Sequence, residues 1–456
     1  MLQKASRTTF KQRLDEMVVI LKREIESGKR APGDHLPSEY ALGEQFHLSK
    51  NSVRKGLAVL VAEGLIEKVP RVGNIVRAQR EDERTTLRFG YYGSLLAEAE
   101  LKALLDRFQA EHPKLRVQLI PLPYINIVET VQEYIDAGML DVLMLNDRHF
   151  LQFTERDQVD WMETTEENTE LYGFVNKAYS DGARQYAHPF VFSPVVLCYN
   201  RDHFESKGVP EPDGGWSWQD VIDSSVRLSE GEERSGFYCH MPSNNRWPIF
   251  LLQCGQAFER DASGKAAVCG SGVMEGIRLT NELLYNQGNP LIVGSDADAE
   301  SLFLQGKVSM IMTTYLNLNA FRGAVEFPFE IAPLPYFRVP RTLLVAVGLA
   351  VVNRSKVKEA ARSLVDYLTS YEAQLHIRQY TYSIPGHKKA AEWIGEEKMY
   401  RPYRFHMYRE IIPTFASISD LKLKSDQLEP LRRELMVYWS RMVDEETICR
   451  KFEEIL

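Results

Sequence analysis

A polar segment at residues 77–86, RAQREDERTT, divides this sequence into two regions with different hydrophobic patterns. Before the segment, apolar residues recur at three- and four-residue steps, which is typical of short amphipathic helices. After it, short apolar strands alternate with helical stretches. With 456 residues, the chain is also too long for one ordinary domain. We therefore predict a small domain at residues 1–77, a linker at 78–86 and a larger unit at 87–456.

The pattern of the first region predicts three helices and two short strands. The first helix covers residues 10–27 and carries a continuous apolar stripe. Ser38 and Ser49 stand where N-caps begin the second and the third helix. One side of the third helix is apolar at Val53, Leu57 and Leu60. The strands are predicted at residues 65–69 and 74–77.

Charge is divided unevenly between the two regions. Residues 1–80 contain 15 Lys and Arg against 9 Asp and Glu, a net charge of +6, whereas the whole chain carries −8. Residues 81–456 therefore carry −14. A basic first region joined to an acidic second region indicates an anionic partner for the first region alone. The third helix presents Lys50, Asn51, Arg54 and Lys55 away from its apolar stripe, an arrangement that either enters a DNA major groove or merely solvates a surface helix.

The order of motifs across residues 27–69 resembles the winged helix-turn-helix of the gluconate-repressor (GntR) family. The matching motifs are Pro32-Gly33-Asp34, Leu36-Pro37-Ser38-Glu39, Ser52-Val53-Arg54 and Glu63-Gly64-Leu65-Ile66. The resemblance implies binding to a double-stranded DNA operator, and the candidate contact residues are Ser38, Glu39, Ser49, Lys50, Asn51, Arg54, Lys55 and Arg71. Two positions depart from the family pattern. Tyr40 replaces a DNA-contacting arginine, and Arg71 replaces the first glycine of the wing.

The second region begins with alternating strands and helices. Strands are predicted at residues 87–92, 115–121 and 141–145, with helices at 98–112 and 127–137 between them. This order predicts an α/β domain with a mainly parallel sheet. Ligands in such sheets bind beyond the carboxyl ends of the strands, which here supply Tyr91–Ser94, Pro121–Tyr124, Asn146 and Asp147.

Residues 189–220 carry a motif that resembles the family 1 extracellular solute-binding proteins, the receptors of ABC importers. The motif comprises Tyr199-Asn200-Arg201-Asp202-His203-Phe204, Gly208-Val209-Pro210 and Trp216-Ser217-Trp218, and Gly306-Lys307-Val308-Ser309-Met310 follows later. The resemblance extends over residues 87–456. It implies a multidomain chain in which an α+β winged helix-turn-helix precedes a two-lobed α/β type II periplasmic-binding-protein fold.

Such receptors close two lobes over a solute, and most of them recognise carbohydrates with aromatic rings and hydrogen-bonding side chains. The resemblance places candidate ligand-binding residues at strand ends and in the loop SNNRWP. They are Tyr92, Asn146, Asp147, Asn245, Trp247 and Tyr315. A phosphorylated ligand would require convergent cations, for which Arg246 and Arg341 are the candidates. We therefore expect a neutral or weakly polar saccharide as the small-molecule effector.

Other function classes fit the sequence less well. The motifs of P-loop, zinc-protease and serine-hydrolase enzymes are missing, as is the Schiff-base lysine segment of an aminotransferase fused to this type of DNA-binding domain, so we predict no enzyme, no cofactor and no metal site. The most apolar stretch, Thr342 to Val352, is too short for a membrane span. The five cysteines lack C-x-x-C spacing, and we expect them to be free thiols in a reducing cytosol.

The starting segment MLQKASRTTFKQRLDEM has no secretory signal, which disfavours an exported receptor. The remaining hypothesis is a cytoplasmic transcription regulator that acts as a homodimer. A saccharide in the second region would then control the DNA affinity of the first. An exported importer receptor and an aminotransferase-type fusion enzyme stay as the alternatives.

Overall fold

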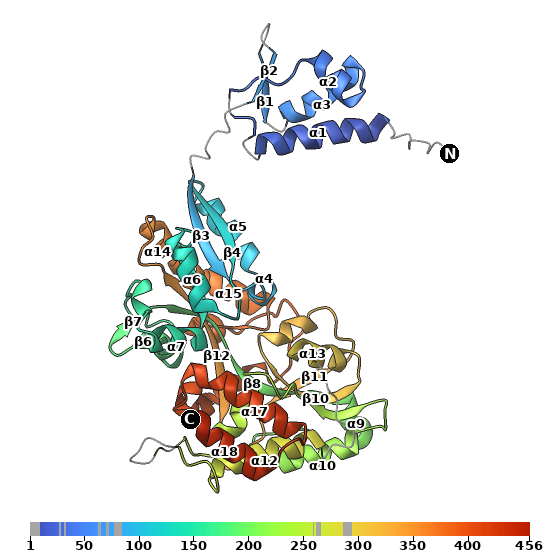
Figure 1. The fold of residues 1–456 in the computed structure, drawn as a ribbon. Coiled ribbons are helices and arrows are strands. Elements are labelled where there is room, and N and C mark those ends of the chain that lie inside the picture. The colour runs from blue at the N-terminus through green and yellow to red at the C-terminus, as the bar shows by residue number, and fades with distance from the viewer. Residues whose placement is uncertain are drawn as a thin grey trace. The chain divides into compact units, whose positions relative to one another are not determined.

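The computed structural model describes residues 10–26, 29–31, 33–62, 65–69, 73–76, 84–258, 260, 266–285 and 294–456. The chain separates into two compact units, Met1–Thr85 and Thr86–Leu456 (Figure 1). Most of the predicted linker, residues 78–83, lies outside the described residues. Strand β3 (Thr85–Tyr91) starts at the end of that segment.

The first unit has the predicted order of three helices and two strands. The helices are α1 (Phe10–Glu26), α2 (Glu39–Phe46) and α3 (Lys50–Ala62), and the strands are β1 (Ile66–Val69) and β2 (Gly73–Val76). Ser38 caps α2 by accepting the backbone N–H of Ala41 at 3.1 Å. His47 ends α2 in a left-handed conformation, with a φ of 51°, which turns the chain toward α3. Strands β1 and β2 follow α3 in the chain and pair antiparallel, as the wing does in the predicted fold. The winged helix-turn-helix prediction is therefore confirmed.

Close packing of α1 against α3 fixes the position of the third helix. Met17 and Leu60 are fully buried, and Leu57 is 3% exposed. Gly56 lies in the contact between the two helices, where a Cβ atom would overlap the Met17 Cε atom. The apolar stripe of α3 therefore faces inward, and its cationic side faces solvent.

The second unit is built on one mixed sheet. In the part of the chain that the structure describes, ten strands join, with the order β4-β3-β5-β12-β8-β10-β9; β11 and β13 add to β8, and β14 adds to β12. These strands are β4 (Leu115–Pro121), β5 (Val142–Asn146), β8 (His188–Asn200), β9 (Ser235–Tyr238), β10 (Val308–Thr314), β11 (Phe329–Ala332), β12 (Thr342–Val351), β13 (Ile384–Pro385) and β14 (Phe415–Ala416). A separate hairpin pairs β6 (Ser180–Asp181) with β7 (Arg184–Gln185).

The long strands β8 and β12 connect the two lobes of this unit (Figure 1). Strand β12 pairs with β5 through Val347–Val351, in the first lobe, and β8 pairs with β10 through Val195–Tyr199, in the second. The two long strands run in opposite directions, so the central pairings are antiparallel. The prediction of a two-lobed fold is thus confirmed, whereas the prediction of a mainly parallel sheet is wrong.

Helices cover both lobes. They are α4 (Leu95–Glu98), α5 (Leu101–Glu111), α6 (Ile127–Asp136), α7 (Asp147–Glu155), α8 (Gly173–Asn176), α9 (Arg201–Lys207), α10 (Trp218–Leu228), α11 (Trp247–Leu252), α12 (Gly272–Tyr285), α13 (Asp296–Leu304), α14 (Lys358–Thr369), α15 (Tyr371–Tyr380), α16 (Lys388–Ala391), α17 (Leu428–Trp439) and α18 (Glu445–Ile455). Among the described residues, no helix combines the length and apolar character needed to cross a bilayer.

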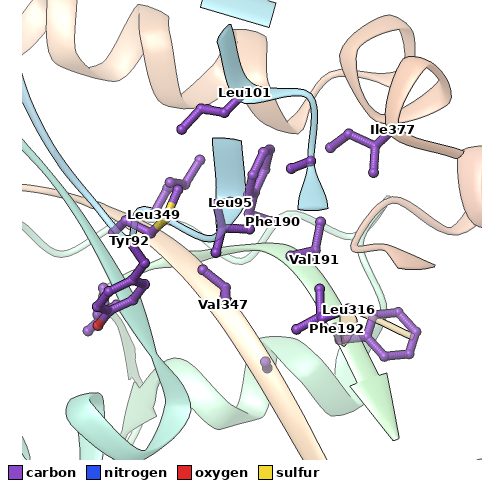
Figure 2. Packing of buried hydrophobic residues seen from close by; sticks show 14 of the residues in the cluster. Tyr92, Leu95, Leu101, Phe190, Val191, Phe192, Leu316, Val347, Leu349 and Ile377 are labelled. Carbon is purple, nitrogen blue, oxygen red and sulfur yellow. The ribbon is translucent and has the colours of Figure 1, made fainter. Parts of the chain in front are cut away.

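The core of the first lobe lies next to the ends of the strands. Figure 2 shows Tyr92, which follows β3, near Leu95 of α4 and Val347 of β12. All three are buried, and Phe190 of β8 joins them. This packing fixes the carboxyl ends of β3 and β5 relative to the crossing strand β12.

The cysteines depart from the prediction that all five are free thiols. Cys269 and Cys449 form a disulfide with a Cα–Cα separation of 5.3 Å. Their sequence separation of 180 residues gives no local signal for the pairing. The remaining cysteines, Cys198, Cys239 and Cys254, are buried free thiols as predicted.

Candidate functional sites

The exposed side of α3 carries the predicted DNA-binding residues. Lys50, Asn51, Arg54 and Lys55 are all exposed, as are Ser38 and Ser49. The two serines also have structural roles, because Ser38 caps α2 and the Ser49 hydroxyl contacts that of Ser52 at 2.6 Å. Arg71, the predicted wing contact, lies outside the described residues.

Arg54 and Glu39 form an ion pair across the helix-turn-helix. The Arg54 Nε–H group donates to both carboxylate oxygens of Glu39, at 3.0 and 2.9 Å. The hydrogen bond from Arg54 holds the pKa of Glu39 below its usual range. The pairing directs the Arg54 side chain back toward the start of α2.

A groove of about 860 Å³ lies between the start of α2, the start of α3 and the β1–β2 hairpin. Its lining includes Glu39, Tyr40, Lys50, Lys68 and Asn74. Tyr40 is 75% exposed, so its ring replaces the family's arginine on an accessible surface. Lys68 was not predicted from the sequence, because its strand, rather than a helix motif, brings it to the groove.

The second unit contains a cavity of about 310 Å³ between its two lobes. Four of the six predicted ligand-binding residues line it: Tyr92, Asn146, Asp147 and Asn245. The first three lie at the ends of strands of the first lobe, and Asn245 precedes α11 of the second. Strand β12 also lines the cavity, through Leu343–Val345 and Val347.

Trp247 and Tyr315 do not line this cavity, which corrects two predictions. Trp247 is 1% exposed, begins α11 and donates its Nε1–H to Asn244 Oδ1 at 3.2 Å. Tyr315 is fully buried, and its hydroxyl donates to the carbonyl oxygen of Phe405 at 2.9 Å. Both rings belong to hydrophobic cores, in which they pack among buried apolar side chains.

Tyr124 is the accessible aromatic ring of the cavity. It stacks on Tyr92 with ring centroids 4.8 Å apart and an interplanar angle of 13°. Tyr92 is 1% exposed, whereas Tyr124 is 51% exposed. The outer face of Tyr124, rather than Tyr92, is therefore available to a ligand. Strand-end reasoning had indicated residues 121–124 without selecting this ring.

The first-lobe carboxylates of the cavity are partly shielded from water. Asp147 Oδ1 accepts the backbone N–H of Ala346 at 3.1 Å, and burial raises the pKa of Asp147 to about 6. Burial also raises the pKa of Glu98 to about 7. The Ser94 hydroxyl donates to Glu98 Oε2 at 3.1 Å and lies 3.0 Å from the Tyr124 hydroxyl. This wall can accept hydrogen bonds from hydroxyl groups.

Arg148 is a cation that sequence analysis missed. It lines the cavity directly after Asp147, and in the described part of the chain its guanidinium makes no hydrogen bond or ion pair with another side chain. Burial lowers its pKa, and attraction to Asp147 opposes that effect. Arg246, one of the two cations that the sequence suggested, is fully buried and pairs with Asp296 at 3.2 Å.

Asn317 lines the cavity from the second lobe and is held by two neighbours. Its Nδ2–H donates to Glu300 Oε1 at 2.9 Å, and its Oδ1 accepts from the Thr314 hydroxyl at 3.0 Å. Glu300 also accepts from the Thr313 hydroxyl at 2.9 Å. Burial raises the pKa of Glu300 to about 7. This support orients the Asn317 amide at the cavity wall.

A neighbouring cavity of about 530 Å³ extends the cleft. The two cavities share Asp147, Arg148, Leu344 and Ile418. The second is lined further by aromatic and polar side chains, among them Phe174, Lys177, Phe415, Ser417 and Asp420. The combined space exceeds what a single small ring requires, and the mixture of rings and hydrogen-bonding groups is typical of small-molecule sites.

The two-lobed fold with an interlobe cleft defines a solute-binding protein. Residues 103–400 match the bacterial extracellular solute-binding protein family, so the chain belongs to that family. Residues 15–76 match the gntR family of bacterial regulatory proteins. The resemblances inferred from the sequence are thus confirmed for both regions, and both families are binding or regulatory rather than catalytic.

Individual relatives agree with this division. A binding protein of Brucella abortus (strain 2308) is 21% identical over 296 residues, which are 62% of this chain and 72% of the relative. The uncharacterized HTH-type transcriptional regulator YieP of Escherichia coli (strain K12) is 41% identical over 59 residues, which are 13% of this chain and 26% of YieP. Maltose-bound MalE3 of T. maritima is similar in structure, with a TM-score of 0.69 at 19% sequence identity. The match covers 81% of this chain and 98% of the MalE3 chain.

Proposed function

We propose that this chain is a cytoplasmic transcription regulator whose affinity for a DNA operator is controlled by a saccharide in the interlobe cleft. The observation that carries the proposal is the presence of both modules in one chain. A gntR-family helix-turn-helix at residues 15–76 precedes a solute-binding fold with a lined cavity. A transport receptor has no use for a DNA-binding helix, whereas a ligand-responsive regulator needs both parts.

The DNA-binding proposal rests on the exposed side of α3. Lys50, Arg54 and Lys55 point away from the core on a helix whose opposite side packs on α1. Cations that neutralise phosphates supply most non-specific affinity, and a side chain near the N-terminus of a recognition helix reads base edges. We assign Arg54 to base contact and Lys50 and Lys55 to phosphate contact.

The saccharide proposal rests on the chemistry of the cleft. The exposed face of Tyr124 suits the apolar C–H face of a sugar ring. Asn146, Asp147, Asn245 and Asn317 offer amide and carboxylate groups that match hydroxyl donors and acceptors. Arg148 adjoins Asp147, so the local charges offset each other and favour a neutral ligand. The solved MalE3 relative holds maltose, and the second cavity provides room for more than one sugar unit.

Control of DNA binding requires that the saccharide prefer one of two states of the protein. An effector changes DNA affinity only by the ratio of its affinities for the DNA-competent and DNA-incompetent states. Closure of the two lobes over the saccharide would supply that difference. In a homodimer, it would alter the arrangement of the two recognition helices.

Titration calorimetry of the full chain with glucose, maltose and maltotriose tests the ligand class. We expect heat of binding from at least one saccharide, and anisotropy with labelled operator DNA should then shift when that saccharide is added. Operator fragments can be obtained by selecting genomic DNA on the purified protein. Saccharide binding without any DNA binding would overturn the regulator, and DNA binding that responds only to charged non-sugar solutes would overturn the saccharide.

An exported receptor remains the second candidate function. The family description is extracellular, and the disulfide between Cys269 and Cys449 suits an oxidising compartment. Cell fractionation with an antibody against the chain separates the two candidates. A cytoplasmic, nucleoid-associated pool supports the regulator, and a pool released by osmotic shock supports the receptor.

A further inference from the structure

Cys269 differs from the other four cysteines in accessibility. Cys269 is exposed in the segment before α12, and Cys449 is 3% exposed on α18. Their Cα separation of 5.3 Å lies within the usual range for a disulfide. Burial raises the pKa of Cys239 to about 12 and that of Cys254 to about 11, so these thiols are poor nucleophiles. Thiol–disulfide exchange is therefore expected at Cys269 and its neighbour Cys449.

Contacts other than the disulfide also hold the two segments together. Glu453 follows Cys449 by one helical turn on α18, and its Oε1 accepts the backbone N–H groups of Val268 and Cys269, both at 3.0 Å. Ile448 and Phe452 on the same helix are fully buried in the core of the second lobe. Reduction would therefore leave the two thiols adjacent, since α18 stays docked. Such proximity favours rapid reclosure of the bond.

We propose that Cys269 and Cys449 form a reversible thiol–disulfide site that fastens the C-terminal helix to the second lobe. The oxidant is a low-molecular-mass disulfide such as oxidised glutathione. The exposed Cys269 thiolate attacks one sulfur of the oxidant and releases one thiol. The Cys449 thiolate then attacks Cys269 Sγ and releases the second thiol. Two protein thiols lose two protons and two electrons, and one oxidised glutathione becomes two reduced molecules.

The bond changes the stability of the unit that holds the cleft. Its covalent loop spans 180 residues of sequence and includes the cavity-lining residues Asn317, Leu344 and Ile418. A cross-link over a long loop stabilises a fold chiefly by restricting the unfolded chain. Oxidation should therefore raise the unfolding temperature, and reduction should lower it. In a cytoplasmic regulator, the site would make the stability of the effector-binding unit depend on the thiol pool.

The same groups also suggest a competing occupant. The sulfurs of Cys269 and Cys449 and a carboxylate oxygen of Glu453 lie within 4.8 Å of one another, so a thiophilic metal ion has three ligand atoms in reach. Glu453 already accepts two backbone hydrogen bonds, which satisfies one carboxylate oxygen without a metal. We therefore assign the site to thiol–disulfide exchange and treat zinc binding as an outcome of the test.

The test equilibrates the full-length protein in buffers of graded reduced and oxidised glutathione. Thiol titration after denaturation should give five thiols in the reduced protein and three in the oxidised protein. Mass spectrometry of the oxidised protein should identify a peptide pair joined through Cys269 and Cys449. The unfolding temperature should rise by about 5 °C or more on oxidation and fall back on reduction.

Matched variants separate this site from a general effect of oxidant. Cys269→Ser and Cys449→Ser should each remove the redox dependence of the unfolding temperature, while Cys254→Ser should retain it. Five thiols at every glutathione ratio, or equal unfolding temperatures for the oxidised and reduced wild type, would overturn the proposal. Protection of two thiols by zinc, reversed by a chelator, would assign the site to a metal instead. If a variant does not fold, the thiol counts and unfolding temperatures of the wild-type protein still test the proposal.

Discussion

Arg54 donates its Nε–H to both carboxylate oxygens of Glu39, so a residue of the recognition helix is paired with the first residue of the preceding helix. The pair is partly exposed, with 50% of the Arg54 side chain and 20% of the Glu39 side chain accessible. Its contribution to folding is therefore small. In the proposed mode of DNA binding, the pair orients the Arg54 guanidinium before DNA binds.

Arg54→Ala should remove base readout at one operator position. We expect a cost of roughly 1–3 kcal/mol for the preferred base and little change for the other bases at that position. Anisotropy titrations with operators that carry single base-pair changes measure this difference. An equal loss for all sequences would make Arg54 a phosphate contact.

Glu39→Gln should loosen Arg54 without deleting it. The neutral amide weakens the charge-assisted hydrogen bonds, so Arg54 loses a fixed orientation. We expect discrimination between operator bases at the Arg54 position to fall, while the affinity for random DNA stays the same or rises because one negative charge is removed. A fall in random-DNA affinity would contradict this role and indicate that Glu39 itself binds DNA.

Lys55→Ala should weaken DNA binding uniformly across sequences. An exposed lysine on α3 acts as a phosphate contact, and removing one such contact should reduce the slope of log affinity against log salt by about 1. Titrations at several salt concentrations give the slope. An unchanged slope would place Lys55 outside the DNA interface.

Tyr124→Ala should weaken saccharide binding at least tenfold, because it deletes the exposed ring of the cleft. Stacking of an aromatic ring on a ligand face is worth about 1 kcal/mol or more. The control is Tyr315→Phe, which removes a hydroxyl hydrogen bond in the core. That variant should lose roughly 0.5–1.5 kcal/mol of unfolding free energy and keep its saccharide affinity. Calorimetry and thermal unfolding measure both quantities, and the opposite pattern would move the site toward Tyr315.

Glu300 should make the protein less stable as the pH rises. Burial raises its pKa from 4.5 to about 7. Below pH 4.5, the carboxyl is protonated in both states and has no effect. Between pH 4.5 and 7, the unfolded chain releases the proton and the folded chain retains it, so the free energy of unfolding falls by an amount on the order of 1–3 kcal/mol; above pH 7 the loss is constant.

Glu300→Gln removes this titration and keeps an acceptor for Thr313 and Asn317. The difference in unfolding temperature between the variant and the wild type should therefore grow in favour of the variant from pH 5 to pH 8. Glu98 and Asp147 also have raised pKa values, but they are present in both proteins and cancel in the difference. Parallel pH profiles would show that Glu300 ionises normally in the folded state.

The sequence by itself determined the local elements and the order of the two modules. The helix-turn-helix follows from apolar steps of three and four and from the cap at Ser38, because these contacts join residues close in the chain. The strand ends also predicted Asn146 and Asp147 at the cleft, since each strand end is a local feature. Family motifs at residues 189–220 added the two-lobed fold.

Only the tertiary structure decided which side chains share the cleft. Trp247 and Tyr315 resemble ligand-facing aromatics in sequence, yet their hydrogen bonds to Asn244 and Phe405 hold them in the core. Arg148 of α7 and Asn317, which follows β10, line the same cavity although they lie far apart in the sequence. The Cys269–Cys449 pair depends on the docking of α18. These outcomes depend on contacts between distant segments, for which local periodicity carries no signal.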